Sequence, residues 1–130
     1  MDLLDTQIFP LIGEPGFRRL VAQFYRQVPN DGILEPMYRG RDLVAAEQRL
    51  GDFLIMRFGG PQHYLDRRGH PRLKMRHHPF AIDQAARDRW IELMEAALKE
   101  TALPEPAVQV LRRFFHAAAT FLINQAPADE

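Results

Sequence analysis

The chain has 130 residues, 46% of them apolar, with no cysteine and a formal net charge of zero. This length and composition fit one domain over residues 1–130 and exclude disulfides and thiolate metal sites, so we expect a protein of the reducing cytoplasm. The balanced charge argues against nucleic acid as the main partner, and the lack of both an apolar run of about 20 residues and a basic leader argues against a membrane.

The first predicted element is a long helix that begins at Pro15, a residue suited to a first helical turn. Its apolar positions recur every three or four residues, and the turn residues at 29–32 end it. The short segment 33–38 that follows has room for one helical turn. The apolar stripe of the first helix consists of Phe17, Leu20, Val21, Phe24, Tyr25 and Val28.

Three further long helices are predicted. The second begins near Asp42, a good N-cap, and ends at Gly59-Gly60, the third is capped by Asp83, and Pro104 opens the fourth. No segment alternates with a period of two, so we expect an all-α fold without a sheet. The inward positions are Leu43, Ala46, Leu50, Phe53, Leu54 and Phe58 in the second helix, Trp90, Ile91, Met94, Ala97 and Leu98 in the third, and Val108, Leu111, Phe114, Phe115, Ala118, Phe121 and Leu122 in the fourth.

The segment 59–82 has neither helical nor strand periodicity. It holds Tyr64, four of the five histidines, and a basic cluster at 67–76 that contains no acidic residue. A gap of this length in a compact domain is usually functional or disordered, and its aromatic content favours an ordered functional loop with short helical turns. The basic cluster is either a solvated face or an anion site, for which the planar arginine fork is well suited.

The candidate chemical groups are few. The sequence has no HExxH, no GxSxG, no phosphate-binding glycine loop and no serine, so no catalytic residue is assigned. A lone histidine is more often structural than a ligand. Tyr25 and Trp90 are either core aromatics or two hydrogen-bond donors directed into one pocket.

The residues of the irregular segment resemble a known family. Gly59-Gly60-Pro61, Tyr64 and the run 68–80, RGHPRLKMRHHPF, are similar to the haem-binding region of group II truncated haemoglobins, which reads GGP, then Y, then RGHPxLRxRHxPF. Residues 87–90 match the family's RDxW, and Tyr25 and Tyr38 fall where it has two pocket tyrosines. The similarity runs from about residue 10 to about residue 124. The departures are minor: a lysine at position 74, where arginine is usual, and a histidine at position 78.

The resemblance implies a two-over-two helical sandwich around haem b, which would lie between the second and third long helices and the loop. It implies His77 as the iron ligand, with its second ring nitrogen donating to a backbone carbonyl. It places Tyr25, Tyr38 and Trp90 as donors to a small ligand, beside Ala46 and Leu50. It gives Phe53 and Leu54 as pocket wall, and Tyr64, Arg72 and Arg76 as contacts of the haem propionates.

Three functions follow as alternatives. The first is reversible binding of oxygen and other diatomic ligands such as carbon monoxide and nitric oxide. The second is redox chemistry at the same haem, peroxidase-like or consuming nitric oxide, which would need an external reductase. The third is a helical interaction domain without haem, with a basic anion-binding loop. A homodimer is left open, and neither nucleic acid nor a membrane is expected as a partner.

Overall fold

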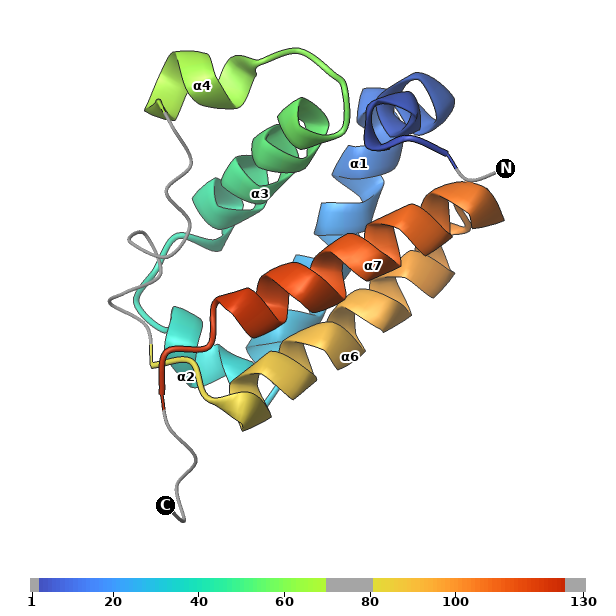
Figure 1. The fold of residues 1–130 in the computed structure, drawn as a ribbon. Coiled ribbons are helices and arrows are strands. Elements are labelled where there is room, and N and C mark those ends of the chain that lie inside the picture. Colours follow the sequence, from blue (N-terminus) through green and yellow to red (C-terminus); the bar gives the residue numbers. More distant parts are fainter. Residues whose placement is uncertain (1–2, 70–80, 126–130) are drawn as a thin grey trace.

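The computed structural model describes residues 3–69 and 81–125, and all regular elements in these ranges are helices (Figure 1). The all-α prediction is therefore confirmed for this part of the chain. In chain order the elements are η1 (Asp5–Gln7), α1 (Ile8–Gln27), η2 (Val28–Asn30), α2 (Leu34–Tyr38), α3 (Leu43–Arg57), α4 (His63–Arg68), α6 (Gln84–Thr101) and α7 (Glu105–Phe121).

The long helices form two layers. Helix α1 packs against α3 in one layer and against α6 in the other, and α6 and α7 lie side by side as antiparallel neighbours joined by a short turn (Figure 1). Helix α4 contacts α3. This is the two-over-two sandwich expected of a truncated globin. No helix among the described residues is long and apolar enough to cross a membrane.

Helix α1 is bent at Gly13, whose φ of 68° and ψ of 175° are not helical. Pro15 therefore lies in the first turn after the bend, as predicted, but the helical turn before the bend was not expected. A hydrogen bond joins this turn to the end of α3: the amide of Phe9 donates to the carbonyl of Phe58 at 2.9 Å. Gly59 has a φ of 100° and lies so close to the backbone of Thr6 that a Cβ would be 2.4 Å from its carbonyl oxygen.

The predicted helix caps are confirmed. A carboxylate oxygen of Asp42 accepts from the amide of Ala45 at 3.1 Å, and Asp83 accepts from the amide of Ala86 at 2.8 Å. Such bonds satisfy amides that have no partner within the helix. The short turns expected within 59–82 are represented by α4.

The core lies between the two layers and matches the predicted stripes with one exception. Phe121 was expected to face inward, but 55% of it is exposed. It precedes Leu122 by one residue and therefore lies about 100° around the helix axis from it. Leu122, which was also expected to face inward, does so and lines the cavity. A buried carboxylate, Asp52, joins α3 to α1 through an ion pair of 2.5 Å with Arg18.

Candidate functional site

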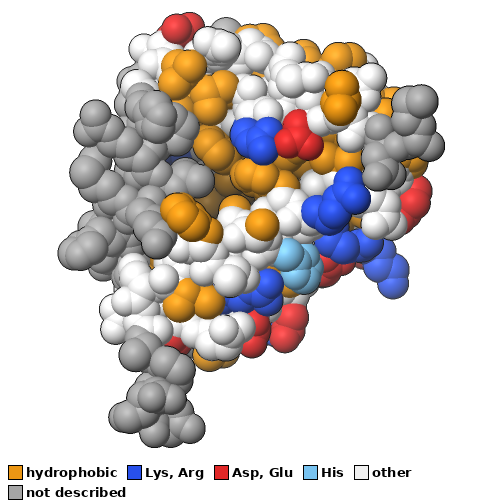
Figure 2. Space-filling model, viewed as in Figure 1, with side chains coloured by type: hydrophobic (Ala, Val, Ile, Leu, Met, Phe, Trp, Pro, Cys, Tyr) orange, Lys and Arg blue, Asp and Glu red, His pale blue; other side chains and the backbone are white. Residues whose placement is uncertain are grey.

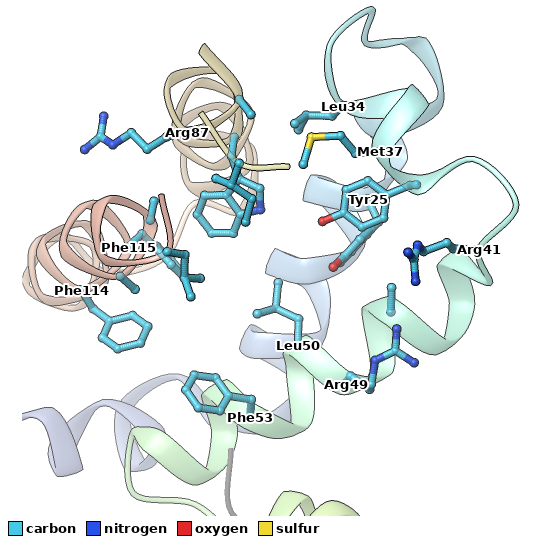
Figure 3. Close-up of a pocket in the computed structure, with 18 of the residues that line it drawn as sticks. Tyr25, Leu34, Met37, Arg41, Arg49, Leu50, Phe53, Arg87, Phe114 and Phe115 are labelled. Carbon is cyan, nitrogen blue, oxygen red and sulfur yellow. The ribbon is translucent and has the colours of Figure 1, made fainter. Parts of the chain in front are cut away.

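A cavity of about 570 Å³ opens between α3 on one side and α6 and α7 on the other. Figure 2 shows hydrophobic side chains within a hollow between α3 and α7. Helix α2 and the end of α1 close it at one side (Figure 3). Its apolar lining consists of Leu34, Met37, Ala46, Leu50, Phe53, Ile82, Ala86, Phe114, Phe115, Ala118, Ala119 and Leu122.

One end of the cavity carries three polar side chains. Tyr25 and Tyr38 are hydrogen-bonded to each other, and Trp90 is hydrogen-bonded to Tyr38. The two tyrosine rings meet edge to face with centroids 5.8 Å apart. Figure 3 shows the hydroxyl of Tyr25 directed into the hollow. The structure thus brings together the three donors that the sequence predicted from separate helices.

Burial determines the protonation of the two tyrosines. It raises the pKa of Tyr25 well above its ordinary value of 10.0, and the neighbouring Tyr38 raises it further. Burial also raises the pKa of Tyr38, although the hydrogen bonds from Tyr25 and Trp90 act in the opposite direction. Both hydroxyls are therefore protonated at neutral pH. Because an indole N–H can only donate, the hydroxyl oxygen of Tyr38 accepts the proton of Trp90.

Two arginines line the rim of the cavity beside the tyrosines. Figure 3 shows Arg41 and Arg49 near each other at α3, and the positive charge of Arg49 lowers the pKa of both Tyr25 and Tyr38. Guanidinium groups in this place suit carboxylates at the edge of a bound group. Neither arginine was predicted as a site residue, since both lie outside the basic cluster at 67–76. The available signal was that Arg49 lies three residues after Ala46, on the same helical face.

Most of the other predicted pocket residues line the cavity. Ala46, Leu50 and Phe53 do so from α3, and Tyr64 does so from α4, with its ring 5.6 Å from that of Phe53. Leu54, predicted as pocket wall, lies instead fully buried in the core. It follows Phe53 by one residue and so points about 100° away from it.

Helix α7 contributes more side chains to the cavity wall than the sequence predicted. The sequence placed its apolar stripe in the core, whereas Phe114, Phe115 and Leu122 border the cavity. Core and cavity wall carry the same apolar signature, so periodicity does not distinguish them. The predicted ligand His77 and the predicted propionate contacts Arg72 and Arg76 lie outside the described residues.

One histidine can be excluded from the cavity on its contacts. His116 of α7 has its Nε2 3.3 Å from Glu95 and its Nδ1 3.4 Å from Arg87, and it does not line the cavity. Arg87 lines the cavity, but its guanidinium points away from the hollow (Figure 3). Among the described residues no cluster of three or more histidine or acidic side chains is placed to hold a metal ion.

The cavity fits a large, flat, mostly apolar group. A volume of about 570 Å³ is within the range of about 300–1,000 Å³ for ligand pockets. Aliphatic and aromatic side chains from α3 and α7 can sandwich a macrocycle, arginines at the rim can pair with its carboxylates, and the donors Tyr25, Tyr38 and Trp90 leave a polar corner for a small second ligand. A haem, which is a flat apolar macrocycle with two carboxylates, has these features.

Comparisons with known proteins also indicate a globin. Residues 7–123 match the family model of the bacterial-like globins. The chain is 44% identical to the haemoglobin of Chloroflexus aurantiacus, whose structure matches with a TM-score of 0.87 over 91% of this chain and 98% of that one. It is 30% identical to the group 2 truncated haemoglobin YjbI of Bacillus subtilis over 94% of this chain and 92% of that protein.

A further solved structure is that of a truncated, oxygen-avid haemoglobin from Bacillus subtilis. It is 30% identical, with a TM-score of 0.85 over 90% of this chain and 98% of that one. With the helical sandwich and the cavity described above, the chain belongs to the bacterial-like globin family and is a haem-binding globin of the group II truncated haemoglobin type.

Proposed function

We propose that the cavity holds haem b with Nε2 of His77 as the protein ligand of the iron, and that the protein reversibly binds oxygen and related diatomic ligands. Haem supplies an iron centre that takes up diatomic gases and changes its oxidation state. In this proposal residues 1–130 act as one domain in the cytoplasm. The observation that carries the proposal is the corner formed by Tyr25, Tyr38 and Trp90 inside an otherwise apolar cavity.

The corner carries three side chains that can donate a hydrogen bond to a small polar ligand. Tyr25 and Tyr38 each have a hydroxyl proton, and Trp90 has its indole N–H. An apolar cavity strengthens such a bond, because little water competes for the donor.

A relative supports oxygen as the ligand. The Bacillus subtilis globin is described as oxygen-avid and shares this fold. Oxygen held at a haem iron would carry partial negative charge, and the donors Tyr25, Tyr38 and Trp90 would stabilise such charge by roughly 1–3 kcal/mol for each bond. Slow release of oxygen is therefore expected, which suits sensing or redox chemistry better than rapid delivery.

Replacing the proposed iron ligand tests the assignment. His77→Ala is expected to prevent stable incorporation of haem, seen as loss of the Soret band in the purified protein. His78→Ala is the matched control, since it removes the neighbouring imidazole and is expected to keep the band. If His77→Ala retains full haem and an unchanged spectrum, the ligand assignment is wrong.

The same corner also favours a second function, haem-based redox chemistry with peroxide or nitric oxide. Tyr38 can donate a hydrogen bond to a peroxide or nitric oxide held in the cavity, while the bonds from Tyr25 and Trp90 keep Tyr38 oriented. An external reductase would have to return electrons after each turnover. Steady-state consumption of peroxide or nitric oxide that falls in Tyr38→Phe would support this function, and no consumption above free haem would remove it.

A further inference from the structure

The loop between α1 and α2 contains a buried carboxylate outside the cavity. Asp31 is only 4% exposed. One of its oxygens accepts from the amides of Ile33 at 3.1 Å and Leu34 at 2.9 Å, and its carbonyl accepts from the amide of Glu35 at 2.9 Å. Asp31 thus satisfies the first amides of α2 and fixes how this short helix begins.

The other oxygen of Asp31 is bound from α6. The Nε of Arg89 donates to it, while the Nη1 of Arg89 donates to the exposed Glu92 at 2.5 Å. Arg89 immediately precedes Trp90 in the sequence. The residue that holds the start of α2 and the residue that bonds Tyr38 are therefore neighbours on one helix.

Helix α2 is consequently attached to α6 at both of its ends. Asp31 and Arg89 make the attachment at its start, and Tyr38 and Trp90 make the one at its end. At a rise of about 1.5 Å per residue, the five residues of α2 that lie between the two attachments form a helix about 7.5 Å long. Two separate attachments fix the direction of α2, whereas a single attachment would let the helix rotate about that point.

Helix α2 cannot hold its own direction. It spans only Leu34–Tyr38, five residues, and isolated helices of this length are not stable in water. Its last residue, Tyr38, carries a hydroxyl that must meet both Tyr25 and Trp90 within hydrogen-bond distance. Hydrogen bonds weaken steeply with misalignment. A rotation of α2 about its start would therefore displace the hydroxyl of Tyr38 and weaken its hydrogen bonds.

We propose that Asp31 and Arg89 are positioning residues, which act through α2 to hold the hydroxyl of Tyr38 against the indole of Trp90. They do not touch the cavity themselves. The part of this inference that concerns ligand release rests on the function proposed above. The part that concerns the bond between Tyr38 and Trp90 is independent of any ligand.

The direct test removes the attachment at the start of α2. Arg89→Leu keeps the apolar stem and leaves the cap of Asp31 on α2 in place. Trp90 is the single tryptophan of the chain, so its indole N–H gives one resonance in a ¹⁵N spectrum of the full-length protein. We expect this resonance to move and its exchange with solvent to become about fivefold faster, the effect of weakening one hydrogen bond. Arg89→Lys should restore part of the original signal.

Glu92→Gln is the matched control. It removes the exposed partner of Arg89 but leaves the bond to Asp31, so the indole resonance should stay in place. If Arg89→Leu does not fold, Asp31→Asn is the second variant, because asparagine still offers an oxygen to cap α2 but carries no charge for the arginine. An indole resonance unchanged in whichever of these two variants folds would overturn the proposal.

A double-mutant comparison separates positioning from general destabilisation. Arg89→Leu should speed oxygen release about fivefold in the native background and should have no effect in a Tyr38→Phe background, where the hydroxyl is gone. An equal effect in both backgrounds means a merely structural role and refutes the proposal. If Tyr38→Phe alone leaves release unchanged, the donor role in the proposed function fails, while the indole signal still decides the positioning role.

Discussion

Replacing Trp90 by phenylalanine removes one donor from the cavity and leaves most of its packing. The indole ring lies 5.0 Å from the ring of Phe24 and 5.7 Å from that of Phe115, and a phenylalanine ring can keep much of both contacts. The Nε1–H of Trp90, which donates to Tyr38, has no equivalent in phenylalanine. The change therefore acts mainly on hydrogen bonding.

The size of the effect depends on what the indole bonds in the liganded protein. If Trp90 bonds only Tyr38, the loss is a neutral hydrogen bond of about 0.5–1.5 kcal/mol, which raises the oxygen dissociation rate about 2- to 12-fold. If Trp90 turns to the polarised ligand itself, the bond contributes about 1.5–3 kcal/mol, and the rate rises about 10- to 150-fold. We expect an increase in either case, and its size distinguishes the two arrangements.

The measurement is stopped-flow displacement of oxygen by carbon monoxide. Phe24→Leu is the control for packing, because it removes a buried ring 5.0 Å from that of Trp90 without removing a polar atom or a residue that lines the cavity, and it should change the rate less than twofold. A dissociation rate unaffected by Trp90→Phe, or an equal rise in Phe24→Leu, would refute the reasoning that this corner stabilises the ligand through hydrogen bonds.

Three further predictions concern stability. Asp52→Asn leaves Arg18 without its buried partner and should lower the free energy of unfolding in urea by about 1–3 kcal/mol, less than for a fully buried pair because Arg18 is one-third exposed. Gly59→Ala should lower it by about 1–3 kcal/mol or more, seen in a thermal melt, because the residue has a φ of 100° and its Cβ would collide with Thr6. Burial opposes ionisation of Asp31, but hydrogen bonds from the amide of Leu34, from Arg89 and from the amide of Ile33 outweigh it and lower the pKa. The stability that this shift contributes is complete above the unfolded pKa of about 3.9 and is lost as pH falls through the lower folded pKa, so Asp31→Asn should flatten the acid limb of a stability–pH curve.

Each stability prediction has a control in the same chain. Glu14→Gln removes the exposed partner of Arg18, an ion pair of 3.7 Å, and should cost less than 1 kcal/mol. Gly32→Ala places a Cβ where nothing lies within 4 Å, so it should not reproduce the effect of Gly59→Ala. Equal losses in control and test would contradict the proposed causes. An acid limb unchanged in Asp31→Asn would show that other carboxylates determine it.

The sequence predicted the helices well because their signals are local. Asp42 and Asp83 indicate where helices start, because each side chain accepts a hydrogen bond from the amide three residues further along the chain. Helical periodicity indicates the buried faces. Phe121 marks the limit of this reasoning. It lies next to Leu122, which does line the cavity, and a buried face predicted from periodicity can be wrong by about one residue at its edge. Leu54 was placed in the pocket wall by the family resemblance, whereas periodicity placed it in the core, where it lies.

The cavity was predictable only through the family motif. Periodicity alone did not decide whether Tyr25 and Trp90 are core aromatics or donors in a pocket, since both arrangements have the same spacing. The arginines at the rim, Arg41 and Arg49, were missed because their grouping arises from the fold and not from the sequence. The ion pair of Asp31 with Arg89 joins residues 58 positions apart, and no local pattern indicates it.

The aromatic rings of the core have a consequence for how such a protein can change over time. Phe9, Phe17, Phe58 and Phe114 follow one another with centroids 5.2–6.3 Å apart, and the last of them lines the cavity. Rings in contact do not move independently in a close-packed interior. A substitution near the N-terminus can therefore reshape the cavity from a distance, so ligand affinity can drift during evolution while every residue that touches the ligand is conserved.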